Sequence, residues 1–291
     1  MSYEDYMNHV DFLRQNHFLI KEDANLYSEK RYARSFLHYQ SNGANPAEVQ
    51  KKLANKKVMI LGCGGIGNHV ALILATSGIG EIVLVDDDII ELTNLTRQIL
   101  FTESDVGKTK SAVIKRELLA RNSNIIVSEI NLRITKQSLL ARLPAADIWI
   151  VSADEPAQLM TWVNRYCVAT GQSYINAGYV NDIAIFGPLY VPGKTGCYEC
   201  QNVIANTEIN EKNGLLCESV KSINNNYKVA TFPPVNAVAA AFCAGDIIKF
   251  LGEYDTPLAL NKRIGIWSNA LKIEHQNMNV SPLCQICGGI L

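Results

Sequence analysis

Gly62-Cys63-Gly64-Gly65-Ile66-Gly67 joins a short apolar segment, residues 57–61, to a longer one, residues 68–77, and this junction decides the fold. The first segment has the length and composition of a buried strand, and the second has those of a helix. A Gly-x-Gly-x-x-Gly run between a strand and a helix is typical of nucleotide-binding proteins, because glycines let the backbone approach a phosphate and expose amides to it. The glycines that we predict to bind a nucleotide are Gly62, Gly64, Gly65 and Gly67.

Further strand-like and helix-like segments alternate after this junction. They are the strand at residues 81–85, the helix at 110–122, and the strands near 125–130 and 147–151. Such alternation predicts a parallel sheet with helices on both faces, so the fold class is predicted to be α/β with a Rossmann-like sheet. Beyond about residue 170 the pattern changes to strand-like runs, and a polar loop follows at residues 202–228.

The composition excludes several classes of protein. The 291-residue chain is 48% hydrophobic and 19% charged with a formal net charge of -1, whereas a dedicated nucleic-acid binder normally has a basic excess. Residues 1–6 are acidic and polar, unlike a signal peptide. The most apolar later stretch, residues 235–251, contains Asn236, Asp246 and Lys249, so we predict it to be too short and too polar to cross a membrane. A cytoplasmic protein without nucleic-acid or membrane partners is expected.

The glycine run alone does not distinguish ATP from NAD, and its glycines could also serve only the close packing of helix on strand. Asp86 ends the second predicted strand, where a carboxylate can accept ribose hydroxyls in either case. The segment at residues 86–98 then adds an arginine and two amides, and Lys110 and an isolated Asp154 follow. A triphosphate needs such cations and a carboxylate that holds magnesium, whereas backbone amides suffice for the pyrophosphate of NAD. The sequence therefore favours ATP with Mg²⁺.

In combination these motifs resemble the adenylation core of the ThiF/MoeB family, which is related to ubiquitin-activating enzymes. The resemblance runs from about Arg31 to the C-terminus and rests on Gly-x-Gly-Gly-x-Gly, the strand end at Asp86, Asn-Leu-x-Arg-Gln, Gly-x-x-Lys and the later Asp. It implies an adenylyltransferase that cleaves ATP to AMP and pyrophosphate, with Asp154 as the magnesium ligand. The other residues expected to contact the nucleotide are Gly65, Asp86, Asp88, Asn94, Arg97, Gln98 and Lys110.

The N-terminal part of the chain is expected to complete the catalytic set. The segment Arg31–Arg34 resembles the family segment whose arginine reaches the triphosphate of a partner subunit, and Arg34 is the matching position. Arg34 therefore joins Arg97, Lys110 and Asp154 as a predicted catalytic residue, and the resemblance implies a homodimer. We predict an N-terminal helical segment at residues 1–45 that carries this dimer arm, and an adenylation domain at residues 46–291. Residues 1–20 resemble the last helix and strand of a winged-helix peptide clamp.

Four of the eight cysteines form two Cys-x-x-Cys pairs, Cys197 with Cys200 and Cys284 with Cys287. Each pair presents two thiolates from one turn, and four thiolates complete the tetrahedral site that Zn²⁺ takes in a structural role. A redox-active Cys-x-x-Cys is the alternative, but that motif is normally single and begins a helix. We predict a zinc ion that fastens the C-terminal tail to the middle of the chain, and the family resemblance implies the same site.

Longer runs resemble a narrower branch of the family, the microcin C adenylating enzymes. They are residues 42–46, 79–82, 176–184, 186–194 and 261–268. The resemblance implies a short ribosomally made peptide as the substrate, adenylated at a C-terminal Asn to give a peptidyl-AMP in antibiotic biosynthesis. An alternative is the pantocin-type branch, which activates glutamate side chains of a peptide.

Two further alternatives remain open. One is activation of a sulfur-carrier protein that ends in Gly-Gly, for which Cys217 is the only candidate thioester cysteine. The other, from a different class, is a nucleotide-binding zinc scaffold without catalysis. The complete set of Arg97, Lys110 and Asp154 argues against the scaffold, because a scaffold has no use for it.

Overall fold

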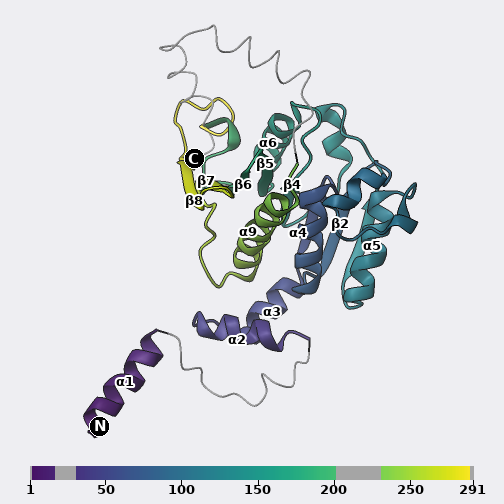
Figure 1. Cartoon of the computed structure of the whole chain (residues 1–291). Helices are drawn as coiled ribbons and strands as arrows, with labels where there is room; N and C mark the ends of the chain where they lie inside the picture. The colour runs from purple at the N-terminus through teal and green to yellow at the C-terminus, as the bar shows by residue number, and fades with distance from the viewer. Residues whose placement is uncertain (1, 17–30, 201–230, 289–291) are drawn as a thin grey trace.

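The computed structural model describes residues 2–16, 31–200 and 231–288, and an eight-stranded sheet lies at its centre (Figure 1). The spatial order is β3-β2-β1-β4-β5-β6-β7-β8. β3, β2, β1, β4 and β5 are parallel neighbours, whereas β5 to β8 are antiparallel. The strands are β1 Lys57–Leu61, β2 Glu81–Val85, β3 Ile126–Ile130, β4 Ile148–Val151, β5 Tyr174–Val180, β6 Ile183–Tyr190, β7 Lys262–Trp267 and β8 Lys272–Asn277. The predicted α/β class is confirmed, and an antiparallel half extends the parallel sheet.

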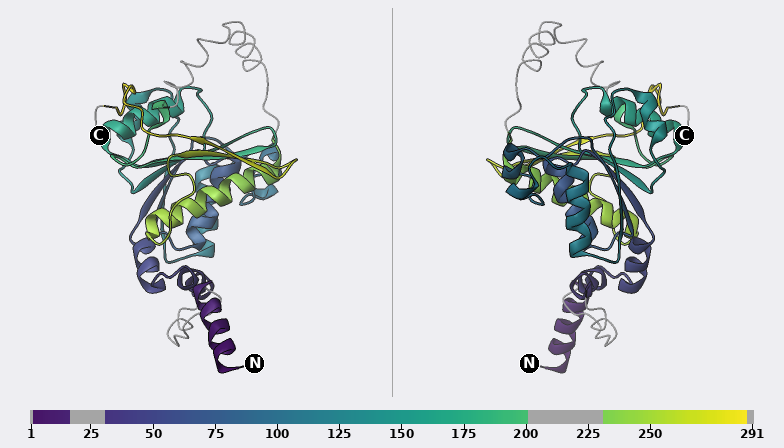
Figure 2. Two further views of the ribbon diagram at one scale, coloured as in Figure 1. Left: turned by 90° about the vertical axis from the view of Figure 1, so that its left-hand side faces the viewer. Right: turned by 90° about the vertical axis from the view of Figure 1, so that its right-hand side faces the viewer.

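Helices cover both faces of this sheet (Figure 2). α4, α5 and α9 pack on one face around a large apolar core. α6 and the 3-10 helix η4 pack on the other face, together with the four paired cysteines. The helices are α1 Tyr3–Gln15, α2 Ala33–Ser41, α3 Pro46–Ala54, α4 Gly65–Thr76, α5 Lys110–Arg121, α6 Leu159–Thr170 and α9 Pro233–Gly252, with the 3-10 helices η2 Leu92–Thr96, η3 Glu103–Asp105 and η4 Gln137–Arg142.

The glycine run makes the turn from β1 into α4. Gly62 has a φ of +93°, in the left-handed region that favours glycine. A Cβ on Gly67 would lie 2.0 Å from the carbonyl oxygen of Gly62, so only glycine lets α4 start this close to β1. A Cβ on Gly64, the N-cap of α4, would instead meet no atom within 4 Å. Gly67 therefore serves helix–strand packing, while Gly64 borders open space.

Helix α9 corrects one prediction. The apolar stretch forms a 20-residue helix, Pro233–Gly252, which is long and apolar enough to cross a membrane by length and composition. In the fold it packs against α4, β5 and β6, and 56% of its most apolar window is buried. The carboxylate of Asp246, which looked like a break in the stretch, is buried and accepts hydrogen bonds from the amides of Leu258 (2.8 Å) and Ala259 (2.7 Å). The stretch is therefore longer than residues 235–251, and the fold accommodates its acidic residue through two backbone hydrogen bonds.

The described residues of the N-terminal segment contain two helices, α1 and α2. None of the residues of α1 is buried, whereas α2 packs on α3 and buries Phe36 and Tyr39. The ring of Tyr39 lies 4.9 Å from that of Tyr254, so α2 contacts the segment that follows α9. The end of the segment that resembles a peptide clamp, residues 17–20, and the polar loop with Cys217 lie outside the described residues. The boundary at residue 45 stays a prediction.

Candidate active site

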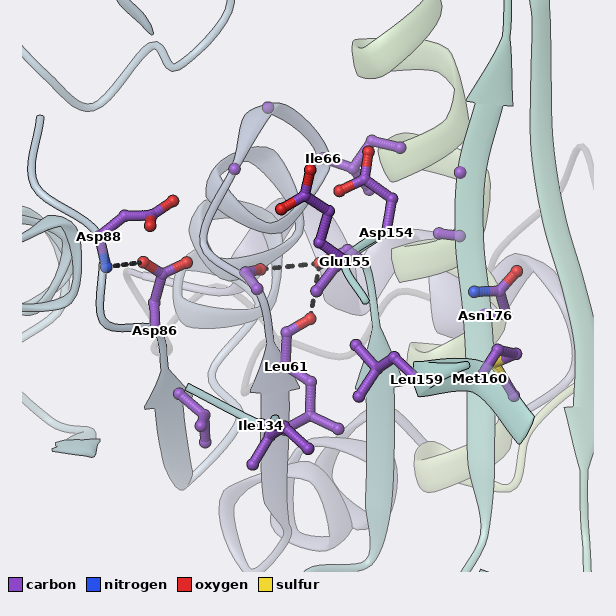
Figure 3. A pocket seen from close by; sticks show the side chains of 18 of the residues that line it. Leu61, Ile66, Asp86, Asp88, Ile134, Asp154, Glu155, Leu159, Met160 and Asn176 are labelled. Carbon is purple, nitrogen blue, oxygen red and sulfur yellow. Dashed lines mark hydrogen bonds between the residues drawn. The ribbon is translucent and has the colours of Figure 1, made fainter. Parts of the chain in front are cut away.

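A cavity of about 610 Å³ opens at the carboxyl ends of β1, β2, β4 and β5. It lies where the strand order reverses between β1 and β4, the usual ligand position in an open α/β sheet, and its volume is in the range of ligand sites. In the view of Figure 3, Asp86 and Asp88 lie on one side of the glycine turn and Asp154 on the other. The predicted site residues that line it are Gly62, Gly64, Gly65, Asp86, Asp88, Arg97, Gln98, Lys110 and Asp154.

Asp86 fastens the glycine turn to the end of β2. Its carboxylate accepts hydrogen bonds from the amide of Cys63 (2.6 Å) and from the amide of Asp88 (2.9 Å). Burial raises the pKa of Asp86 above its ordinary value, although these two amide bonds oppose the rise. The open space beside Gly64 lies next to this carboxylate in the same cavity. The cavity therefore offers a hydrogen-bond acceptor to a ribose, and at the same place it lets the attached phosphates approach the backbone closely.

Lys110 brings a buried cation to the cavity wall. It is the first residue of α5, and its Nζ lies 2.7 Å from the carboxylate of Asp88, while its amide donates to the Asp88 carbonyl. A second acid, Asp105, secures the turn before α5 by accepting hydrogen bonds from the two terminal guanidinium nitrogens of Arg116 (2.8 and 3.0 Å) and from Lys108 (2.9 Å). These partners hold the pKa of Asp105 well below its usual range. Lys108 therefore helps to anchor the segment that carries Lys110.

The segment after β2 supplies Arg97 and Gln98. Gln98 is buried and lines the cavity, and its Oε1 has no hydrogen-bond partner among the described residues. Asn94 does not line the cavity; its side chain caps the amide of Glu91 (3.1 Å), and its carbonyl accepts from the amides of Arg97 and Gln98. Asn94 therefore supports the backbone that carries Arg97 and Gln98 and is not itself a lining residue of the cavity.

Asp154 follows β4 and projects as an exposed carboxylate into the cavity. It makes no hydrogen bond or ion pair within the described residues, so it is available to a cation. Arg34 lies on α2, is exposed, and does not line the cavity. The described part of one chain therefore brings together all the predicted residues except Gly67, Asn94 and Arg34.

Several lining residues were not predicted. Asn176 on β5 donates to the carbonyl of Val151 (3.0 Å), and the buried Asn236 on α9 lies against Gly65. Tyr179 and Tyr198 also contribute. Asn176 and Tyr179 belong to a run that resembles one enzyme branch, but no local pattern in the sequence places any of the four at the cavity.

The two cysteine pairs meet in one buried cluster, as predicted. The four Sγ atoms lie within 4.8 Å of one another, with 3.7 Å from Cys197 to Cys284 and 3.9 Å from Cys197 to Cys200. Zinc–sulfur bonds in a tetrahedron place sulfurs about 3.8 Å apart, so the cluster fits a structural metal ion. The side-chain hydrogen bond between Cys200 and Cys197, together with the amide of Ser281, lowers the pKa of Cys200 below its ordinary value.

The cysteine turn is connected to the cavity. Tyr198 stands between Cys197 and Cys200 and lines the cavity. Its amide donates to the hydroxyl of Tyr174 (2.8 Å) and to the side chain of Asn164 (3.1 Å). A metal ion in the cluster would therefore also fix one wall of the cavity.

The cavity combines a glycine turn, an acid at the end of the second strand, two cationic side chains and a carboxylate without a partner among the described residues. This combination defines an enzyme that activates a substrate with a nucleoside triphosphate. The chain belongs to the ThiF family, whose family model matches residues 37–286, and it is an ATP-dependent adenylyltransferase.

One related enzyme and two solved structures illustrate the relationship. The sulfur carrier protein ThiS adenylyltransferase of Escherichia coli strain K12 is 32% identical over 211 residues, which cover 72% of this chain and 77% of that one. The crystal structure of E. coli MccB with ATP is 61% identical with a TM-score of 0.89, covering 99% of this chain and 82% of that one. The microcin C7 biosynthetic enzyme MccB in complex with N-formylated MccA is 60% identical with a TM-score of 0.88, covering 99% and 83%.

Proposed function

We propose that the enzyme adenylates the C-terminal carboxylate of a short ribosomally made peptide that ends in Asn, as a step in microcin C-type antibiotic biosynthesis. The observation that carries this proposal is the 60% identity, over 99% of the chain, to MccB structures that contain MccA, N-formylated MccA or a succinimide. The cavity supports it, because it is larger than the part expected to hold the nucleotide. Beyond Asp154 it is also lined by the neutral polar side chains of Asn176, Tyr179 and Tyr198. We also propose that the reaction takes place in the cytoplasm, where ATP and the new peptide are found.

A carboxylate is a poor electrophile, and transfer to AMP turns it into a mixed anhydride with a good leaving group. A carboxylate oxygen of the peptide attacks the α-phosphorus of ATP, the bond to the β-phosphate breaks, and pyrophosphate leaves. The side-chain amide nitrogen of the terminal Asn then closes on the activated carbonyl, AMP leaves, and a succinimide forms. The succinimide nitrogen loses its proton and attacks the α-phosphorus of a second ATP, the bond to the β-phosphate breaks and pyrophosphate leaves, and AMP stays on the peptide through an N–P bond.

Each residue of the cavity has a place in this scheme. Arg97 and Lys110 offset the charge that builds up on the phosphates, and Asp86 accepts from the ribose hydroxyls. When ATP is bound, the Lys110 ammonium group donates to a phosphate oxygen, either in place of the Asp88 carboxylate or in addition to it. Asp154 would hold Mg²⁺, which neutralises phosphate charge when bound. The cysteine cluster would hold Zn²⁺ in a structural role.

We propose further that the enzyme is a homodimer and that Arg34 reaches the triphosphate of the partner. Mixed dimers of Arg34→Ala and Asp154→Asn chains are then expected to recover activity, since one of their two sites has both functional groups. Differently tagged chains can be purified as mixed dimers and assayed for pyrophosphate release, beside the two parent homodimers as controls. Inactivity of verified mixed dimers would mean that Arg34 acts within its own chain or has no role.

The central experiment supplies ATP, magnesium and the MccA peptide. The enzyme is expected to release pyrophosphate only when the peptide is present, and mass spectrometry should find AMP attached to the peptide at its C-terminal residue. Cys217→Ala is expected to leave the rate nearly unchanged, because a peptidyl-AMP needs no thioester.

Other results would redirect the assignment. Activity toward a carrier protein ending in Gly-Gly, with loss of rate in the Cys217 variant, would favour sulfur-carrier activation, which the ThiS adenylyltransferase similarity supports. A product altered at a glutamate side chain would favour the pantocin-type branch. Absence of pyrophosphate release with every substrate, in protein that still binds ATP, would leave a nucleotide-binding scaffold.

A further inference from the structure

A second cavity lies on the antiparallel half of the sheet, beside the active site. Its volume is about 420 Å³. It is lined by Ile183, Ile185, Arg263, Gly265, Trp267, Glu274, His275 and Gln276. We call the hollow formed by Ile183, Ile185, Gly265 and Trp267 the strand groove. The residues come from β6, β7 and β8, so strand pairing determines how the groove lies relative to the active site.

The strand register joins the two cavities. Gly178 on β5 pairs with Ile185 on β6, Ile185 pairs with Gly265 on β7, and Gly265 pairs with Glu274 on β8. Side chains of directly opposed residues lie on the same face of a sheet. Gly178 lines the active-site cavity, whereas its neighbour Ile185 lines the second cavity. Gly178, Ile185 and Gly265 therefore form a row on one face of the sheet, and this row runs from the adenylation site into the strand groove.

Two glycines of this row, Gly178 and Gly265, leave space above the backbone of the sheet. A Cβ on Gly178 would meet no atom within 4 Å, and a Cβ on Gly265 would meet only the side chain of Ile183, at 3.2 Å. The backbone is therefore open to a ligand at both positions. Beside the floor, Ile183 and Trp267 are opposed and half-buried, and they form an apolar wall.

A polar contact spans the junction between the two cavities. The guanidinium of Arg263 lies over the ring of Tyr198, 5.1 Å from its centroid. Tyr198 lines the active-site cavity and Arg263 lines the second one. On the opposite face of the same strands, Phe186 and Ile264 are buried in the core beside α9. Within the described residues, a ligand that leaves the active site over Gly178 therefore meets the strand groove.

We propose that the strand groove binds the residues of the substrate peptide that precede its C-terminal residue. This inference rests on the proposed peptide adenylation. β5 and β7 are two strand spacings apart, about 10 Å, which an extended peptide covers with about three residues. With the terminal carboxylate beside Asp154, the residues next to it cross Gly178, and those further upstream contact Ile185, Gly265 and Trp267. An apolar, glycine-floored groove accepts varied side chains and selects for chain length.

The test is a ladder of C-terminal fragments of the MccA peptide, from two residues to the whole peptide, assayed for pyrophosphate release. In the wild type, kcat/KM is expected to rise by about tenfold or more over the first residues added upstream, mostly through KM, and then to level off. Ile185→Glu should remove most of this gain and leave the shortest fragment unaffected. Trp267→Ala should act in the same direction and serves if the first variant does not fold. Ile273→Glu is the matched control, since Ile273 is 66% exposed on the other face of β8 and should keep the full gain.

The outcomes separate the inference from the function on which it rests. A wild type that turns over no fragment overturns both. A wild type whose gain with length survives in Ile185→Glu and Trp267→Ala overturns the strand groove alone. A change of oligomeric state in Ile185→Glu, seen by size-exclusion chromatography with the gain unchanged, would instead make this face a subunit interface.

Discussion

Asp154→Ala is expected to lower the rate of peptide adenylation by about three orders of magnitude, because it removes the carboxylate proposed to hold magnesium against the phosphates. The side chain enters the cavity opposite Asp86 and Asp88, and within the described residues it has no partner of its own. A free carboxylate beside a phosphate site is repulsive unless a cation lies between them. Exchange of labelled pyrophosphate into ATP, driven by the MccA peptide, measures the effect directly.

The controls separate chemistry from stability. Asp154→Ala should leave the thermal unfolding midpoint almost unchanged, since an exposed side chain without partners contributes little to stability. Glu48→Ala removes an exposed acid from α3, away from the cavity, and should leave the exchange rate unchanged. Exchange by Asp154→Ala at a rate close to wild type would mean that another group holds the metal.

The parallel half of the fold was predictable because its signals are local. The glycine run, the apolar strands β1 and β2 and the buried β4 each show a pattern within a few residues. β7 and β8 were not predicted, and β8 is exposed along its whole length. Its strand conformation comes from pairing with β7. This pairing is a tertiary effect that the local pattern of residues 272–277 does not predict.

The candidate site was predictable where one segment carries several polar groups. Residues 86–98 with Lys110 and Asp154 were found because their charge is unusual beside a glycine turn. Asn176, Asn236 and Tyr198 were missed, since β5, α9 and the cysteine turn meet only after the chain has folded. Asn94 shows what a motif leaves open: this polar residue supports the backbone of its neighbours and is not a lining residue of the cavity, so its contact with the nucleotide stays a prediction.

Loss of the metal is expected to have the largest effect on stability. We expect purified protein to contain one zinc per chain, and Cys284→Ser to lose it. A structural Zn²⁺ contributes on the order of 10 kcal/mol to folding of its site, so losing even half of this should lower the unfolding midpoint by roughly 10 °C. Metal analysis and calorimetry measure the two quantities on the same sample. Cys243→Ala, which changes a buried cysteine outside the cluster, should keep its zinc.

The same substitution should also impair catalysis, although Cys284 is not a lining residue of the cavity. Cys284 lies 3.7 Å from Cys197, and the turn from Cys197 to Cys200 holds Tyr198 at the cavity wall. Without the metal this turn loses its attachment to the C-terminal tail, so the KM for the peptide should rise more than the KM for ATP. Correctly folded wild-type protein with almost no zinc would contradict the assignment. Cys284→Ser that keeps its zinc and its unfolding midpoint would show that three thiolates suffice.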